Sequence, residues 1–325
     1  MIATCPQVEG NFLEVLREHT AGDPQREEIV WTNLTKTDLV TQLGETSTPV
    51  SVRVVAQLLE YHRYRRRQAH KTLSMGHARG RNEQFENIAE WREIYWDSPN
   101  PILSMDTKKK ERLGTYYREG KLYTLEPQLV YDHDFAHAAT GVIFPHSLYD
   151  LKRNVGHLYL GLSHDTSEFA CDNVYRWWQS YGRVWYPQAT SVLLLCDSGG
   201  SNDHRRYVFK EQLQRLAERL QLEVRVAHYP PYTSKYNPIE HRLFPHVTRA
   251  CQGVVFDKLS TVVELMRKTR TRQGLRVTVR VVERFYATAQ PCSPEFKAAM
   301  PILFDAELGQ WNYRAVPTSA ASGLP

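Results

Sequence analysis

The chain has 325 residues, 42% of them hydrophobic, and a formal net charge of +5. This length allows a sizeable core and more than one domain, while so mild a positive charge permits nucleic-acid binding without establishing it. No apolar run is long enough to span a membrane, no secretory signal opens the chain, and the five cysteines form no CxxC pair, so we expect a cytoplasmic protein with reduced thiols and no membrane partner.

Residues 1–30 are weakly patterned and are expected to be a weakly structured segment. In residues 31–72 we expect two short helices. The first begins at a capping threonine, Thr35, and ends at Gly44, and the second follows Ser51 after a polar turn. Two short helices joined in this way have the shape of a helix-turn-helix domain. An ordinary helical hairpin gives the same pattern.

Side chains suited to DNA gather on and after the second of these helices. Ser51, Arg53 and Gln57 are expected to face outward, where such side chains contact phosphates and base edges. A dense basic run follows at residues 62–71. Its arginines are Arg63, Arg65, Arg66 and Arg67. Charge runs are usually only solvated faces, but one that directly follows a candidate recognition helix could track a phosphate backbone.

The rest of the chain is predicted to hold a linker, a second domain and a tail. Residues 73–98 should form a helix that links two domains, because apolar residues recur at helical spacing from Phe85 to Tyr95. The second domain is expected over residues 99–315. Residues 316–325 are expected to be a flexible tail.

Three acidic residues of the second domain fall at the ends of predicted elements. Asp106 lies near the end of the strand predicted at residues 102–105, and Asp197 directly follows the apolar strand predicted at 191–196. Glu240 falls in the first turn of a helix whose start is marked by an Asn-Pro pair. Carboxylates that meet at one end of a sheet are a layout for a hard divalent cation. For Asp106 taken alone, a solvated loop residue is the commoner interpretation.

Other residues of this domain are weaker candidates. Lys108 and Lys109, beside Asp106, favour an anionic partner. Lys235 and Arg242 lie on either side of Glu240, and two interpretations are open for them: contact with phosphates, or ordinary surface charge. The segment Tyr131–Phe135 could hold a metal through its acids and histidine, although such clusters also occur on loops with nothing bound. Its acids are Asp132 and Asp134. Asp165 is interpreted as a helix cap.

From residue 100 the predicted order is strand, strand, strand, helix, strand, helix, strand, helix. This order predicts an α/β fold, a ribonuclease-H-like mixed sheet with flanking helices, preceded by a small all-α helix-turn-helix domain. Four motifs in the same order resemble the DDE transposases of bacterial insertion sequences, of the ISAzo type within the mariner-like superfamily. They are Met105–Glu111, His164–Ala170, Asp197–Asn202 and Pro230–Phe244.

The resemblance implies a function that the residues alone do not reach. It implies that Asp106, Asp197 and Glu240 are catalytic and hold two Mg²⁺ or Mn²⁺ ions. It further implies a nucleoid-associated DNA transposase that binds the terminal inverted repeats of an insertion sequence and catalyses metal-dependent strand cleavage and strand transfer. The implied partners are double-stranded DNA, from both the repeats and the target, and further copies of the chain in a homodimer or higher synaptic complex. Two alternatives stay open: a ribonuclease-H-like nuclease without strand transfer, and a catalytically inactive DNA-binding regulator derived from a transposase.

Overall fold

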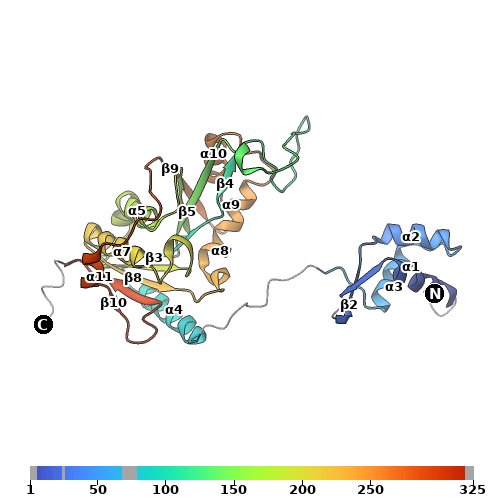
Figure 1. Ribbon diagram of the computed structural model, residues 1–325, viewed down its shortest axis with the longest axis horizontal. Helices are drawn as coiled ribbons and strands as arrows, with labels where there is room; N and C mark the ends of the chain where they lie inside the picture. Colours follow the sequence, from blue (N-terminus) through green and yellow to red (C-terminus); the bar gives the residue numbers. More distant parts are fainter. Residues whose placement is uncertain (1–5, 24–25, 68–78, 319–325) are drawn as a thin grey trace. The chain divides into compact units, whose positions relative to one another are not determined.

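The computed structural model describes residues 6–23, 26–67 and 79–318, with side chains for residues 7–19, 32–67 and 79–318. The chain divides into two compact units, Met1–Leu73 and Ser74–Pro325 (Figure 1). Within the described residues, no helix is long and apolar enough to cross a membrane. The predicted basic run and the predicted linker both extend into residues 68–78, and this part of each lies outside the described residues.

The first unit is built on three helices and a hairpin. Its elements are α1 (Pro6–Glu18), β1 (Thr20–Asp23), β2 (Arg26–Thr32), α2 (Lys36–Glu45) and α3 (Val52–Tyr61). All three helices contribute to one apolar core, in which Phe12, Leu43 and Val55 are fully buried. The observed α1 differs from the weakly structured segment expected at 1–30, because apolar residues at helical spacing give this helix a face that only the core can cover.

Both helices predicted between residues 31 and 72 are present. Thr35 caps α2 in a reciprocal arrangement: its hydroxyl accepts from the Asp38 N–H at 3.2 Å, and the Asp38 carboxylate accepts from the Thr35 N–H at 2.8 Å. Ser51 caps α3 by accepting a hydrogen bond from the Val54 N–H. The predicted cap at Thr35 is therefore confirmed, and the Ser51 side chain has an intramolecular role that the sequence did not indicate.

The second unit is organised on a mixed sheet of nine strands among the described residues. The strands are β3 (Ile102–Thr107), β4 (Glu111–Leu113), β5 (Gly141–Asp150), β6 (Val155–Gly161), β7 (Ser191–Cys196), β8 (Glu223–His228), β9 (Arg276–Val282), β10 (Leu303–Phe304) and β11 (Asn312–Ala315). Their order is β10-β11-β8-β7-β3-β5-β6-β9, and β4 pairs with β5. Strands β3, β7 and β8 are parallel, while β5 runs antiparallel to both β3 and β6. The run β8-β7-β3-β5-β6 is the ribonuclease-H-like order, so the predicted ribonuclease-H-like mixed sheet is confirmed. The prediction that the preceding domain is all-α was wrong, because β1 and β2 pair as an antiparallel hairpin in the first unit.

Helices cover both faces of this sheet. They are α4 (Arg81–Trp96), α5 (Ser167–Trp177), α6 (Arg183–Trp185), α7 (Tyr207–Leu220), α8 (Pro238–Arg242), α9 (Phe244–Ala250), α10 (Leu259–Arg267) and α11 (Pro294–Ala299). Alternate residues of β7 point into two separate cores: Leu194 packs with α5 and α7, and Leu193 and Leu195 pack with α4, α8, α9 and α10. In Figure 1, α5 and α7 lie on one side of the central strands and α8 and α9 on the other. A strand buried on both faces must be apolar throughout, which explains the run Ser191–Cys196.

Helix α4 lies within the linking helix expected at 73–98 and belongs to the second unit. Its Gln84 is fully buried and donates through Nε2 to the His228 carbonyl oxygen and to Asn312 Oδ1, both at 2.9 Å. Ile88 and Tyr95 of the same helix are also buried. The final strands β10 and β11 were missed, because residues 301–315 carry little periodic apolar pattern. Of the predicted tail, residues 319–325 lie outside the described residues.

The helix predicted to begin at the Asn-Pro pair is observed as two short helices. Helix α8 ends at Arg242 and α9 begins at Phe244, with Leu243 between them. The break follows from Pro245, which is placed in the first turn of α9 because proline is not tolerated in a helix interior. Leu243 is fully buried and packs closely against Gly156 of β6.

We expect Gly156→Ala to lower the free energy of unfolding by about 1–3 kcal/mol, because an added methyl overpacks this contact. A Cβ at position 156 would lie 2.4 Å from Leu243 Cδ1. Denaturant unfolding followed by far-UV circular dichroism measures the change. Gly44→Ala is the control, since a Cβ there meets nothing within 4 Å. A Gly156→Ala variant as stable as the parent would show that Leu243 can move aside at no cost.

Candidate active site

Three elements bring the three predicted acids to one edge of the sheet. Strands β3 and β7 are parallel neighbours with Met105 paired to Cys196, so Asp106 and Asp197 are the next residues along the two strands. Glu240 lies in the first turn of α8, which packs against β3. The carboxyl ends of parallel strands are where ligand sites form in open α/β sheets.

The three carboxyl groups are close enough to affect one another's ionisation. Burial raises the pKa of Asp106 well above its usual range, and the charges of Asp197 and Glu240 raise it further. Burial also raises the pKa of Asp197 to about 6, against a lowering by the Gly199 N–H, and the charges of Glu240 and Asp165 add to the rise. The site therefore concentrates negative charge in a partly desolvated place.

A divalent cation fits the chemistry of these donors. Asp197 Oδ1 is buried and has no hydrogen-bond partner in the part of the chain that the structure describes. A buried carboxylate oxygen without a partner is costly unless a cation or donor reaches it. Carboxylate oxygens are the donors that Mg²⁺ and Mn²⁺ prefer. The residues suit such a cation by the type of their donor atoms. Their side chains are not already arranged around an ion, because the described residues contain no group of three or more His, Cys, Asp or Glu side chains placed to hold one.

The alternative metal cluster at Tyr131–Phe135 is not supported. No metal-holding arrangement of side chains occurs there within residues 79–318, and the Asp132 and His133 side chains are 90% and 68% exposed. The segment lies outside the helices and strands of the second unit. Its acids and histidine are side chains of a loop.

Asp165 is not the helix cap that we expected. Thr166 caps α5 by accepting from the Phe169 N–H at 3.1 Å, while Asp165 Oδ1 accepts a hydrogen bond from the Thr107 hydroxyl at 3.1 Å. Burial raises the pKa of Asp165. The sheet topology would have indicated where Asp165 lies. Strand β6 runs parallel to β3, so a residue soon after β6 lies at the same edge of the sheet as Asp106.

A buried histidine that the sequence did not single out hydrogen-bonds to the backbone of Asp197. His228, at the end of β8, is fully buried and its Nδ1 lies 2.8 Å from the Asp197 carbonyl oxygen. Burial lowers the pKa of His228 to about 3, so the ring is neutral and Nδ1 carries the proton that it donates. Its Nε2 then accepts from the Tyr313 hydroxyl at 2.7 Å. The backbone at Asp197 is thus fixed by the neighbouring strands.

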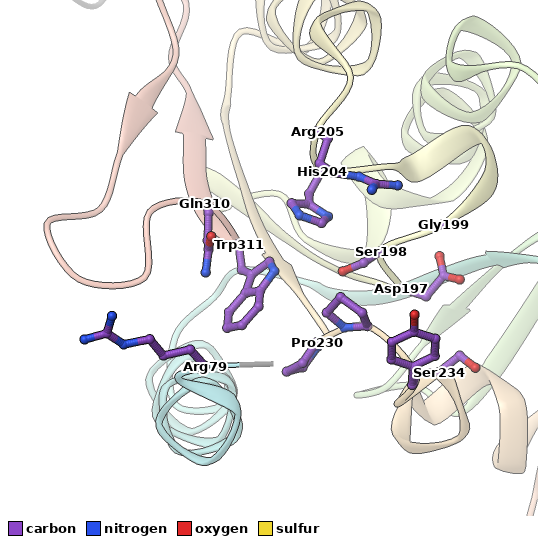
Figure 2. Close-up of a pocket in the computed structure, with 12 residues that line it drawn as sticks. Arg79, Asp197, Ser198, Gly199, His204, Arg205, Pro230, Ser234, Gln310 and Trp311 are labelled. Atoms are coloured by element: carbon purple, nitrogen blue, oxygen red, sulfur yellow. The ribbon is translucent and has the colours of Figure 1, made fainter. Parts of the chain in front are cut away.

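A cavity of about 590 Å³ opens beside Asp197 (Figure 2). Figure 2 shows Asp197 and Ser198 on one side of it and Trp311 and Gln310 on the other. Arg205 also lines the cavity, but its guanidinium is held by both carboxylate oxygens of Asp203 at 3.0 Å. A ligand can therefore reach Asp197 from this side.

The remaining candidate DNA-contact residues differ in the exposure of their side chains and in whether those side chains already have a role inside the protein. Lys108 is bound to Glu111 at 2.6 Å with its side chain only 14% exposed, so its charge is largely used inside the protein. Ser51 caps α3, as described above. The other predicted contact residues are exposed. They are Arg53, Gln57, Arg63, Arg65, Arg66, Arg67, Lys109, Lys235 and Arg242.

Comparison with known proteins gives one family and several similar structures. The family model described as "Rhodopirellula transposase DDE domain" matches residues 11–317. The Mos1 transposase paired-end complex with left transposon end is 14% identical with a TM-score of 0.43, over 79% of this chain and 68% of that one. The Mos1 mariner paired-end complex with Mn is 16% identical with a TM-score of 0.43, over 79% and 69%. No curated protein sequence matches the chain.

Proposed function

The chain belongs to the transposase DDE domain family, and we propose that it binds the terminal inverted repeats of an insertion sequence and cuts and joins DNA strands. One observation carries the proposal: Asp106, Asp197 and Glu240, from distant parts of the chain, interact at one sheet edge, where Asp197 keeps a buried oxygen that no described residue satisfies. Such an edge favours a cation and, through it, a phosphodiester.

We propose that Asp106, Asp197 and Glu240 hold two Mg²⁺ or Mn²⁺ ions. When bound, such ions activate a water or a DNA 3′-hydroxyl and stabilise the leaving oxygen at phosphorus. The protein's own contribution is to hold the carboxylates in place. Asp106 lies on β3 and Asp197 directly follows β7, so the register of these adjacent strands places both backbones, and side chains on strands are held more precisely than those on loops. Their mutual repulsion favours whatever positive charge approaches.

DNA binding is assigned to the first unit and to the catalytic edge. Helix α3 presents Arg53 and Gln57 four residues apart on one exposed face, and an exposed arginine run follows it from Arg63 to Arg67. In a helix-turn-helix the second helix reads the major groove while basic side chains hold phosphates. We propose a homodimer or higher complex as the active form, because two element ends must be brought together.

Removing three arginines, by Arg65→Ala, Arg66→Ala and Arg67→Ala together, should weaken binding to a terminal-repeat duplex and flatten its salt dependence. If each contacts one phosphate, the slope of log K against log salt falls by about 2–3. Fluorescence anisotropy between 50 and 200 mM salt measures it. A triple variant of exposed arginines in the second unit, Arg270→Ala, Arg272→Ala and Arg280→Ala, is the control. The same loss of slope in both would mean that only net charge matters.

A joining assay tests the proposed function. Linear DNA that carries pre-cleaved terminal repeats is incubated with the full chain, a target plasmid and Mn²⁺. Covalent insertion of the ends into the plasmid is the expected result. Cleavage without joining would instead fit the nuclease, and binding with neither reaction would fit the inactive regulator.

A further inference from the structure

We propose that Ser104 and Asn237 form a buried clamp that sets the position of Glu240 relative to Asp106. The proposal rests on the proposed metal-dependent function, because it concerns how two of its acids are held together. Ser104 precedes Asp106 by two residues on β3, and Asn237 precedes Glu240 by three at the start of α8. Both side chains are fully buried.

Three hydrogen bonds make the clamp. The Ser104 hydroxyl donates to Asn237 Oδ1 at 2.5 Å, and Asn237 Nδ2 donates to the Met105 carbonyl oxygen at 3.3 Å. The Ser104 oxygen in turn accepts the Ile239 N–H at 3.0 Å. The hydroxyl therefore serves as both donor and acceptor, and the bonds join the residues just before Asp106 to those just before Glu240.

The helix that carries Glu240 cannot position itself. Helix α8 has five residues, far fewer than an isolated helix needs to be stable. The chain enters it through the single 3-10 turn Ser234–Tyr236 and leaves it at the break before α9. Apolar contacts of Ile239 and Leu243 anchor it to the core, but such contacts are non-directional. Hydrogen bonds supply the directional constraint that a ligand side chain needs.

The Asn237 side chain is committed to this role and not to helix capping. The sequence predicted an N-cap, and Asn237 does occupy the N-cap position, but its side chain makes no capping hydrogen bond. The Ile239 N–H, at the second helical position, is satisfied by Ser104 instead. A side chain from β3 thus replaces the local cap and ties the start of the helix to the strand.

Loss of either side chain should weaken metal binding more than it weakens folding. Partners that orient a metal ligand typically account for 10- to 100-fold in affinity or activity. We therefore expect Ser104→Ala and Asn237→Ala each to raise the apparent Kd for Mn²⁺ by about 10-fold or more. The double variant should be little worse than either single one, because the two residues act as one unit.

The test measures Mn²⁺ binding by the electron paramagnetic resonance signal of the free ion, together with strand cleavage at several Mn²⁺ concentrations. Hydrogen exchange at the Ile239 amide reports the clamp directly and should quicken in Ser104→Ala. Excess Mn²⁺ should restore much of the lost cleavage. Thermal unfolding in each variant separates a folding defect from a binding defect.

Ser147→Ala is the matched control. Ser147 is also fully buried and lies opposite Asp106 on β5, but its hydroxyl donates to the Pro145 carbonyl oxygen and not to α8. If Ser104→Ala and Asn237→Ala bind Mn²⁺ as tightly as Ser147→Ala does, while the parent binds and cleaves normally, the clamp proposal is wrong and the proposed function stands. If the parent neither binds Mn²⁺ nor joins DNA, the proposed function is wrong and the clamp proposal with it.

Discussion

Replacing Asp197 with asparagine is expected to abolish strand cleavage and joining while making the metal-free protein more stable. The lost carboxylate removes a proposed metal ligand, and metal stabilisation of transition-state charge is worth several kcal/mol, so the rate should fall by at least about 10³-fold. Product yield on the pre-cleaved substrate measures this loss. Joining at the parental rate would show that the metal proposal is wrong.

The gain in stability follows from the raised pKa of Asp197. Its pKa is about 6 in the folded chain against 3.8 for an ordinary aspartate. The folded state therefore binds this proton more tightly, and stability is lost as the pH rises from about 3.8 through about 6. At pH 7 the ionised group costs about 3 kcal/mol, an order-of-magnitude value that asparagine should largely recover.

Metal titration separates these two effects. Mn²⁺ at about 100 times its Kd should stabilise the parent by about 2.7 kcal/mol and the Asp197→Asn variant much less. Thermal unfolding with and without Mn²⁺ measures both changes. Asp132→Asn is the control, since that exposed acid belongs to the segment where no metal site is found among residues 79–318. It should leave activity, stability and the Mn²⁺ response unchanged.

Replacing His157 with glutamine should protect the protein from acid. His157 is fully buried beside Trp177, Tyr181 and Trp185, and burial lowers its pKa to about 3. Between pH 6.5 and about 3 the unfolded chain protonates this histidine and the folded chain does not. Each pH unit of acidification in that range therefore costs about 1.4 kcal/mol, or about 2 kcal/mol from pH 6.5 to 5.0.

The comparison of variant and parent isolates this effect. Buried acids such as Asp150, whose pKa burial raises, take up protons in the folded state and oppose the histidine. The variant's stability minus the parent's should rise by about 2 kcal/mol between pH 7.5 and 5.0 in denaturant unfolding. His133→Gln, an exposed histidine, should show no such change. A constant difference for His157→Gln would contradict a neutral buried ring.

The central strands and their acids were readable from the sequence because their signals are local. Strand β7 has the predicted boundaries, since a strand buried on both faces must be largely apolar. The placement of Asp106 and Asp197 at one edge of the sheet then follows, because each lies near or directly after the end of a predicted strand. Glu240 follows from the Asn-Pro helix start, which is observed.

What the sequence did not reveal depends on partners far along the chain. Asn237 has the local pattern of a cap, but a serine on β3 takes its side chain. Asp165 also sits where caps occur, and only the direction of β6 places it near Thr107. Nothing in the sequence around His228 indicates that its ring hydrogen-bonds to the Asp197 carbonyl oxygen. In each case a partner from a distant part of the chain decides what the side chain does.

Strand β11 closes the outer edge of β8, where Asn312 pairs with Ala227 and Ala315 with Val224. An uncovered strand edge is a template for pairing with another chain. During synthesis on the ribosome, β8 emerges long before β11 and keeps that edge open until residues 312–315 follow. The nascent second unit therefore stays exposed to misassembly at this edge until residues 312–315 have been synthesised, and a chaperone would protect it over that interval.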